Sequence, residues 1–287
     1  MRTRLTLLIP VVALATALAA CGDDGPSKAE FTTQADGSCT AGNTTISTTA
    51  KPTNAPGVAA AAGTATSTID AQVGALRAMK TPGGLDKALA LGVVNAIAEV
   101  VGPTKALQEA AGRSDDAAMA RAAVDMQAKA DAASSSAQAF GMSQCGIQLK
   151  FGLGNLFDGV KQVVKASYVS KAETLCRESI ARSETVAAPG NTLASTSRYL
   201  DAQLVISDRL AADLKAITVP PGDEAAVADF VAALENLNTK GKEVSSAAKA
   251  NNPRLVLALV DEVDVAGTAL NAKLDAYGLT TCGTVGS

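Results

Sequence analysis

Cysteines are the residues of this 287-residue chain whose spacing suggests covalent chemistry. Cys39 and Cys145 are 106 residues apart, and Cys176 and Cys282 are separated by the same 106 residues. Four cysteines allow three disulfide pairings, and the alternative is that all four are free, buried thiols. A thiol-redox site is disfavoured because the sequence has no C-x-x-C pair.

A shift of 137 residues superimposes both cysteine pairs and several residues around them. The matched residues are Phe31 with Tyr168, Ala35 with Ala172, Asp36 with Glu173, Phe140-Gly141-Met142 with Tyr277-Gly278-Leu279 and, after a one-residue gap, Leu76, Met79 and Pro82 with Leu214, Ile217 and Pro220. Similarity at a fixed period indicates an internal repeat, so we expect two tandem copies of one domain. Because each copy then carries its own bridge, we expect the disulfides Cys39–Cys145 and Cys176–Cys282.

The composition excludes several kinds of site. The chain has no His and no Trp, and its formal net charge is −3. Without His there is no Ser-His-Asp triad and no His-ligated metal or haem, so we expect no cofactor and no metal. The nearly neutral charge gives no electrostatic reason to bind nucleic acid. Ser246 and Lys249 form an S-x-x-K pair, but the S-D-N and K-T-G motifs that accompany it in penicillin-binding enzymes are absent from the sequence, and we assign no catalytic residue.

The N-terminus has the features of an export signal. Two arginines precede an apolar run from Leu5 to Ala17, which is too short for an ordinary membrane span. The run leads into Leu18-Ala19-Ala20-Cys21, which resembles the lipobox of bacterial lipoproteins. The alternative is a plain secretory signal followed by an unrelated cysteine.

The lipobox resemblance implies a lipid anchor. Residues 1–20 would be a cleaved signal peptide, and the thiol of Cys21 would be diacylglycerylated and held in the cell membrane at its extracytoplasmic face. Each buried CH₂ contributes about 0.8 kcal/mol, so two or more acyl chains hold a protein stably. Disulfides persist in such a compartment. We expect residues 21–30 to be a short flexible tether.

Apolar residues recur at helical spacing throughout both copies. In the last helix of copy two the stripe is Val256, Leu259, Val263, Ala266, Leu270, Leu274 and Tyr277. The matching residues of copy one are Met119, Ala122, Met126, Lys129, Ala133, Ala137 and Phe140, where Lys129 interrupts the apolar stripe. Other helices are expected at 58–80, 157–187 and 191–217. Residues 37–45 are poor helix formers, so the first helix of copy one should be frayed or interrupted. Gly102-Pro103 should kink or split the third helix of copy one, because Pro removes a hydrogen bond of the helix.

These patterns predict an all-α fold with two tandem copies of a disulfide-stapled, up-down-up-down four-helix bundle. The first copy is expected at 31–146, a connector at 147–160, and the second copy at 161–283. The connector concentrates apolar side chains, and we expect Phe151, Leu153, Leu156 and Phe157 to form an apolar contact surface. This surface would serve an interdomain contact, with a membrane surface or a protein partner as alternatives.

One difference between the copies suggests a ligand site. Ala122, Ala133 and Ala137 stand where copy two has Leu259, Leu270 and Leu274. Either the helices of copy one pack more closely, or a gap remains that an apolar ligand could fill. With no catalytic residue assigned and a lipid anchor expected, the favoured function is a non-enzymatic, membrane-anchored module that acts by contacts with an unknown protein partner or as an envelope spacer. The alternative is a carrier or sensor of a lipophilic small molecule, bound in copy one or between the copies.

The predicted disulfide pairing can be tested by peptide mapping under non-reducing conditions. We expect linked peptides that join Cys39 to Cys145 and Cys176 to Cys282, because each repeat should close on itself. A bridge between Cys39 and either Cys176 or Cys282 would contradict the internal repeat.

Overall fold

The computed structural model describes residues 25–284, and within this range the chain forms nine α-helices, one 3₁₀ helix and no strand. This confirms the all-α prediction. The predicted signal peptide and the anchor residue Cys21 lie outside the described residues. The predicted tether ends earlier than expected, because α1 (Lys28–Ser47) already begins at Lys28. Ser27 caps it, with its hydroxyl accepting from the Glu30 N–H while the Glu30 carboxylate accepts from the Ser27 N–H.

The first helical unit contains five rods around one core, where a rod is a single helix, a part of α6, or the consecutive pair α3 and α4. They are α1, α2 (Ala55–Ala78), the pair α3 (Gly84–Ala98) and α4 (Val101–Gly112), α5 (Asp116–Phe140), and the first half of α6 (Ser143–Glu184). The core extends from Phe31 to Val164 along the chain. The first half of α6 packs against α1 and α5 and also touches α2.

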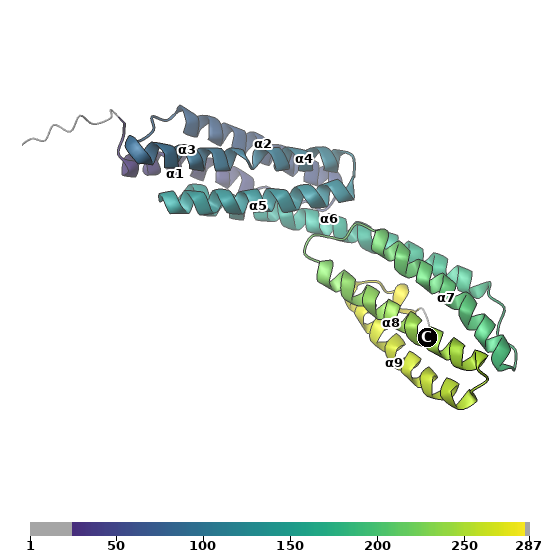
Figure 1. Cartoon of the computed structure of the whole chain (residues 1–287). Coiled ribbons are helices and arrows are strands. Elements are labelled where there is room, and N and C mark those ends of the chain that lie inside the picture. The colour runs from purple at the N-terminus through teal and green to yellow at the C-terminus, as the bar shows by residue number, and fades with distance from the viewer. Residues whose placement is uncertain (1–24, 285–287) are drawn as a thin grey trace, which may run out of the picture.

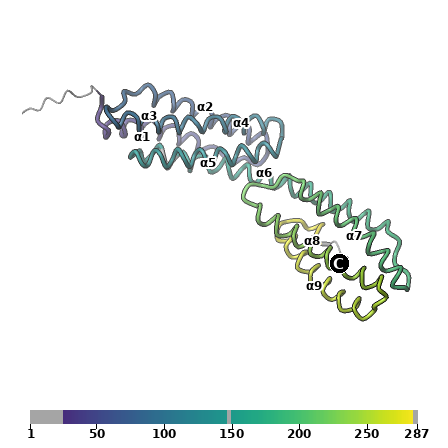
Figure 2. Tube along the Cα trace, viewed as in Figure 1, coloured from purple at the N-terminus to yellow at the C-terminus, as the bar shows by residue number. Residues whose placement is uncertain are grey.

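The second helical unit contains four rods and a smaller core. They are the second half of α6, α7 (Leu193–Ala216), α8 (Glu224–Lys249) and α9 (Pro253–Tyr277), followed by the 3₁₀ helix η1 (Cys282–Thr284). The two units lie end to end, with α6 passing from one into the other (Figures 1 and 2). A helix of 42 residues is about 60 Å long.

The segment expected to be a connector is part of α6, so the predicted boundary of the first copy needs correction. Its buried apolar side chains are Leu149, Leu153, Leu156 and Val160, which lie in the core of the first unit together with Val164, one turn further along α6. Steps of three and four place these residues on one face of a helix. The first unit therefore extends beyond residue 146 and contains one rod more than a four-helix bundle.

Local structure repeats at the predicted offset. Helices α2 and α7 each have 24 residues, and α5 and α9 each have 25. Gly141 and Gly278 end α5 and α9 with the same φ of 99°, a left-handed conformation that glycine adopts at little cost. Ser114 and Asn251, which precede the caps of these helices, are also alike, with φ of 53° and 51°.

The expectation that α1 would be frayed or interrupted is wrong, because α1 is continuous from Lys28 to Ser47. Its buried face, which includes Phe31, Cys39 and Ile46, supplies packing that outweighs weak helix propensity. Gly42 is needed here, since a Cβ at this position would clash with the side-chain amide of Gln72. The predicted break in the third helix is present, because α3 ends at Ala98 and α4 starts at Val101.

The burial of Leu153 gives a test of the role of α6. Leu153 is fully buried in the first core, whereas its neighbour Phe151 is 73% exposed. We expect Leu153→Ala to lower the free energy of unfolding by about 2–5 kcal/mol, and Phe151→Ala to change it by about 0.5 kcal/mol or less. Urea unfolding followed by circular dichroism measures both variants. Equal effects of the two substitutions would show that this part of α6 is not a core helix.

Candidate functional site

Each disulfide joins a residue inside a helix to the chain that follows the last long helix of the same unit, at the start of α6 for Cys145 and in η1 for Cys282. Cys39 is bonded to Cys145 and Cys176 to Cys282, with Cα atoms 5.0 and 5.2 Å apart. These are the pairs that the spacing predicts. All four sulfur-bearing residues are buried, so they staple the structure and offer no exposed thiol.

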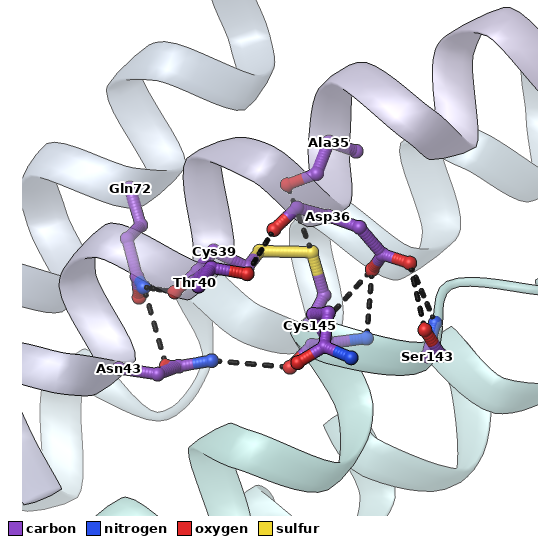
Figure 3. Close-up of a disulfide and its surroundings, with 9 residues drawn as sticks. Ala35, Asp36, Cys39, Thr40, Asn43, Gln72, Ser143 and Cys145 are labelled. Atoms are coloured by element: carbon purple, nitrogen blue, oxygen red, sulfur yellow. Dashed lines mark hydrogen bonds between the residues drawn. A yellow bond between two sulfur atoms is a disulfide. The ribbon is translucent and has the colours of Figure 1, made fainter.

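A carboxylate supports each disulfide from the preceding turn of its helix. Asp36 accepts hydrogen bonds from the backbone N–H groups of Ser143, Gln144 and Cys145, at 2.9, 2.8 and 3.1 Å (Figure 3). Glu173, at the matching position, accepts from the N–H of Thr281 at 2.9 Å. Unpaired N–H groups at the start of a helix favour a carboxylate, so both acids have a capping role.

Two buried amides connect α1, α2 and α6 in the first unit only. The Gln72 amide donates to the carbonyl of Cys39 and to the side chain of Asn43, at 3.0 and 3.2 Å, and Asn43 donates to the carbonyl of Gln144 at 3.1 Å (Figure 3). The matching positions in the second unit hold Ile180 and Leu210. The amides are engaged in these bonds, and we assign them a structural role.

Asp223, which the sequence predicts to be a solvated or capping acid at a helix start, lies buried at the start of α8. Lys161 and Lys165 of α6 lie 3.1 and 3.3 Å from its carboxylate, and the Tyr277 hydroxyl donates to it at 3.1 Å. Burial raises the pKa of Asp223, but the bonds from the two lysines and from Tyr277 outweigh burial and lower this pKa overall. The arrangement fixes α8 and α9 to α6.

An aromatic cluster lies beside Asp223. The Tyr168 ring is 5.7 Å from Tyr277 and 6.3 Å from Phe230 between centroids. The Tyr168 hydroxyl is buried and has no hydrogen-bond partner among the described residues. Burial raises the pKa of Tyr168 to about 12. Phe31 and Phe140 occupy the places of Tyr168 and Tyr277 in the first unit, where they pack edge to face at 6.1 Å.

The predicted apolar contact surface does not form as expected. Leu153 and Leu156 are buried in the first core, and Phe157 is partly buried against it. Only Phe151 of the four is strongly exposed. The helical stripe turns the leucines toward α1 and α5, which is the reason for the difference.

The S-x-x-K residues are not brought together. The Ser246 hydroxyl donates to the carbonyl of Lys242 at 2.8 Å, and the Lys249 ammonium lies 2.8 Å from the Asp201 carboxylate. Each group is engaged elsewhere, so the structure provides no activated serine here.

The alanine positions in copy one are filled by packing. Ala122, Ala133 and Ala137 are buried in the first core, and α5 packs closely against the first half of α6. Of the two explanations, closer approach of helices accounts for these alanines.

The second unit instead contains an open apolar groove, which we call the distal groove because it lies at the end of α6 away from the first unit. It encloses about 530 Å³. Its main apolar residues are Ile180 of α6, Tyr199, Leu200 and Leu204 of α7, Leu237 of α8 and Val263 of α9. The amide groups at its walls have partners: Gln203 donates to the carbonyl of Ser183, and Asn238 bonds Ser207 and Asp208. The groove can therefore bind an apolar surface but carries no group set for catalysis.

No protein-family model, curated protein or solved structure matches the chain. Among residues 25–284, no group of three or more acidic or Cys side chains is arranged to hold a metal ion. None of the helices described here has both the length and the apolar character needed to cross a membrane.

The two buried tyrosines give a matched pair of tests. Tyr168→Phe removes an unpaired buried hydroxyl, so we expect the second unit to be equally stable or more stable by up to about 1 kcal/mol. Tyr277→Phe removes a hydrogen bond to the buried Asp223 carboxylate, and we expect a loss of about 1–3 kcal/mol. Urea unfolding monitored by tyrosine fluorescence measures both. A larger loss for Tyr168→Phe than for Tyr277→Phe would contradict the hydrogen-bond assignment.

Proposed function

We propose that this protein is a non-enzymatic lipoprotein, anchored at the extracytoplasmic face of the cell membrane and acting through protein contacts. The lipobox-like sequence ending at Cys21 and the two disulfides support this location. We also propose that the fold consists of two copies of a disulfide-stapled four-helix bundle, and that the first half of α6 is an additional helical segment of the first copy. Helix lengths and left-handed caps that recur at the same offset support the doubling.

The observation that carries a binding role is the distal groove. The first unit has a filled core, but the second leaves an apolar groove between its helices. An uncovered apolar surface of this kind is typical of an interaction site. Helix α6 places the groove at the end of the molecule opposite the start of α1 (Figure 1). In an anchored protein, this arrangement would direct the groove away from the N-terminal lipid.

A carrier of a lipophilic small molecule is the second candidate function. The distal groove falls within the usual volume of ligand pockets, about 300–1,000 Å³, and its walls are mostly apolar. It lies in the second unit, so this candidate no longer depends on the alanine face of copy one. A carrier should retain lipid through purification, which native mass spectrometry would detect.

The anchor is tested by replacing its cysteine. We expect Cys21→Ser to move the protein from the membrane fraction to the soluble fraction or to leave an uncleaved precursor, and to abolish labelling by radioactive palmitate, because the thiol is the site of lipid attachment. Membrane fractionation and metabolic labelling measure the two effects.

A Cys39→Ser/Cys145→Ser double variant is the control, since it removes two other cysteines and keeps Cys21. It should retain the label. A Cys21→Ser protein that is still labelled would overturn the proposed anchor, and crosslinking on intact cells that yields no protein partner would overturn the contact role.

A further inference from the structure

Positions that are buried in the first unit are open at the matching places of the second. Ala123 of α5 is fully buried, whereas its counterpart Val260 of α9 is 39% exposed. Ile46 of α1 is buried, whereas its counterpart Ser183 is half-buried. The same holds for α2 and α7, where buried Ala61 corresponds to half-buried Tyr199. Ser183 and Tyr199 line the distal groove, and Val260 lies one helical turn before Val263, the residue of α9 that lines it.

The first half of α6 is what covers these positions in the first unit. It runs antiparallel to α5, with Lys150 paired to Asp131 at 3.0 Å and Ser167 donating to Asp116 at 2.5 Å. It also lies along α1, where Asn155 donates to the carbonyl of Ser47. Its inward stripe is Leu149, Leu153, Leu156, Val160 and Val164.

The second unit has no such rod among the described residues. Helix η1, at Cys282–Thr284, occupies the place of the first turn of α6, since Cys282 corresponds to Cys145. The structure describes no helix after η1 that lies between α6 and α9. The surface of α6 and α9 that corresponds to the one covered by residues 149–164 in the first unit is thus uncovered, and we call this surface the open seat and its part on α9 the seat face.

The open seat has the character of a helix-packing surface. On α5, Gln127 and Asp131 are hydrogen-bonded to each other beside Lys150 of α6, and steps of three and four place Ala120 and Ala123 on the same face. The matching face of α9 carries Leu257, Val260, Asp264 and Thr268. Leu257 is 70% exposed. A Cβ built on the neighbouring Gly267 meets no atom within 4 Å, whereas its counterpart Ala130 is fully buried.

We infer that the distal groove binds an amphipathic helix of a partner protein, which lies between α6 and α9 as residues 149–164 lie between α1 and α5. The partner helix carries an apolar stripe at steps of three and four and runs antiparallel to α9. Glu184 lines the groove and Asp264 lies on the seat face, so the partner helix carries basic residues beside its apolar stripe, as α6 carries Lys150, Lys161 and Lys165. This inference deepens the proposed contact role by naming the class of partner, and therefore rests on it.

A synthetic peptide of residues 149–166 is the probe, because it carries both the apolar stripe and the lysines. The full-length protein in lipid nanodiscs is titrated against the fluorescein-labelled peptide, and anisotropy is measured. We expect saturable binding, and we expect the same peptide with Leu153→Asp and Leu156→Asp to bind at least about tenfold more weakly.

Gly267→Leu is the variant that fills the seat without disturbing packed atoms. Leucine favours a helix more than glycine does, so the variant should fold. It should weaken peptide binding at least about tenfold. Gly74→Leu is the matched control, because Gly74 is a helix glycine that, like Gly267, has open space at its Cβ, but lies on α2. This control should bind the peptide as the unaltered protein does.

Three results would overturn the inference. The first is the absence of saturable binding, or binding that Gly267→Leu leaves unchanged. The second is a concentration-dependent dimer in sedimentation experiments that Gly267→Leu abolishes, which assigns the groove to a second copy. The third is a copurifying lipid, found by native mass spectrometry, that Gly267→Leu displaces. If the groove binds no helix, the protein should still be labelled by palmitate and still be crosslinked to partners at other surfaces. Failure of this inference is therefore distinguishable from failure of the proposed function.

Discussion

Helix α6 contributes to two hydrophobic cores at once, and the rest of the structure follows from this sharing. Its first half buries Leu153 and Val160 in the first unit, and its second half buries Tyr168 and Cys176 in the second. A single unbroken helix joins the units without a flexible linker, since its backbone hydrogen bonds continue across the junction. Because the same residues cannot fill both cores, the first unit gains a fifth rod and the second is left with an open seat.

The cysteines and the buried acidic side chains hold the helices of both units in place around α6. Each disulfide lies within one helical unit, and Asp36 and Glu173 hold the chain that carries the second cysteine of each pair. At the junction, Asp223 is held by two lysines of α6 and by Tyr277. A buried carboxylate with three partners is costly to leave unpaired, so this contact favours one orientation of α8 and α9 on α6. With these groups engaged in structure, binding through apolar surface is the role that the geometry supports best.

The two units differ in whether their outer face is covered, and the proposed binding role rests on this contrast. In the first unit the alanines of α5 admit a neighbouring helix at short distance, and the seat is satisfied within the chain. In the second unit larger residues such as Tyr199 and Leu204 line the distal groove, yet about 530 Å³ remains open. The proposed partner helix would complete the second unit in the way that α6 completes the first.

Local spacing of residue types is enough to predict most of the helices, and the shared separation of 106 residues is enough to predict the disulfide pairs. The break before Pro103 is of this kind, and so is the recurrence of glycine at 141 and 278. Residues 147–160 were misjudged as a connector although their leucines have helical spacing, since periodicity shows that a face is apolar but not which core receives it. Similarly, α1 is continuous because burial against α2 and α6 outweighs its weak propensity, and the distal groove exists only because of how α6, α7, α8 and α9 pack. Long-range packing decides which apolar faces are covered, because it depends on which segments distant in the sequence come together.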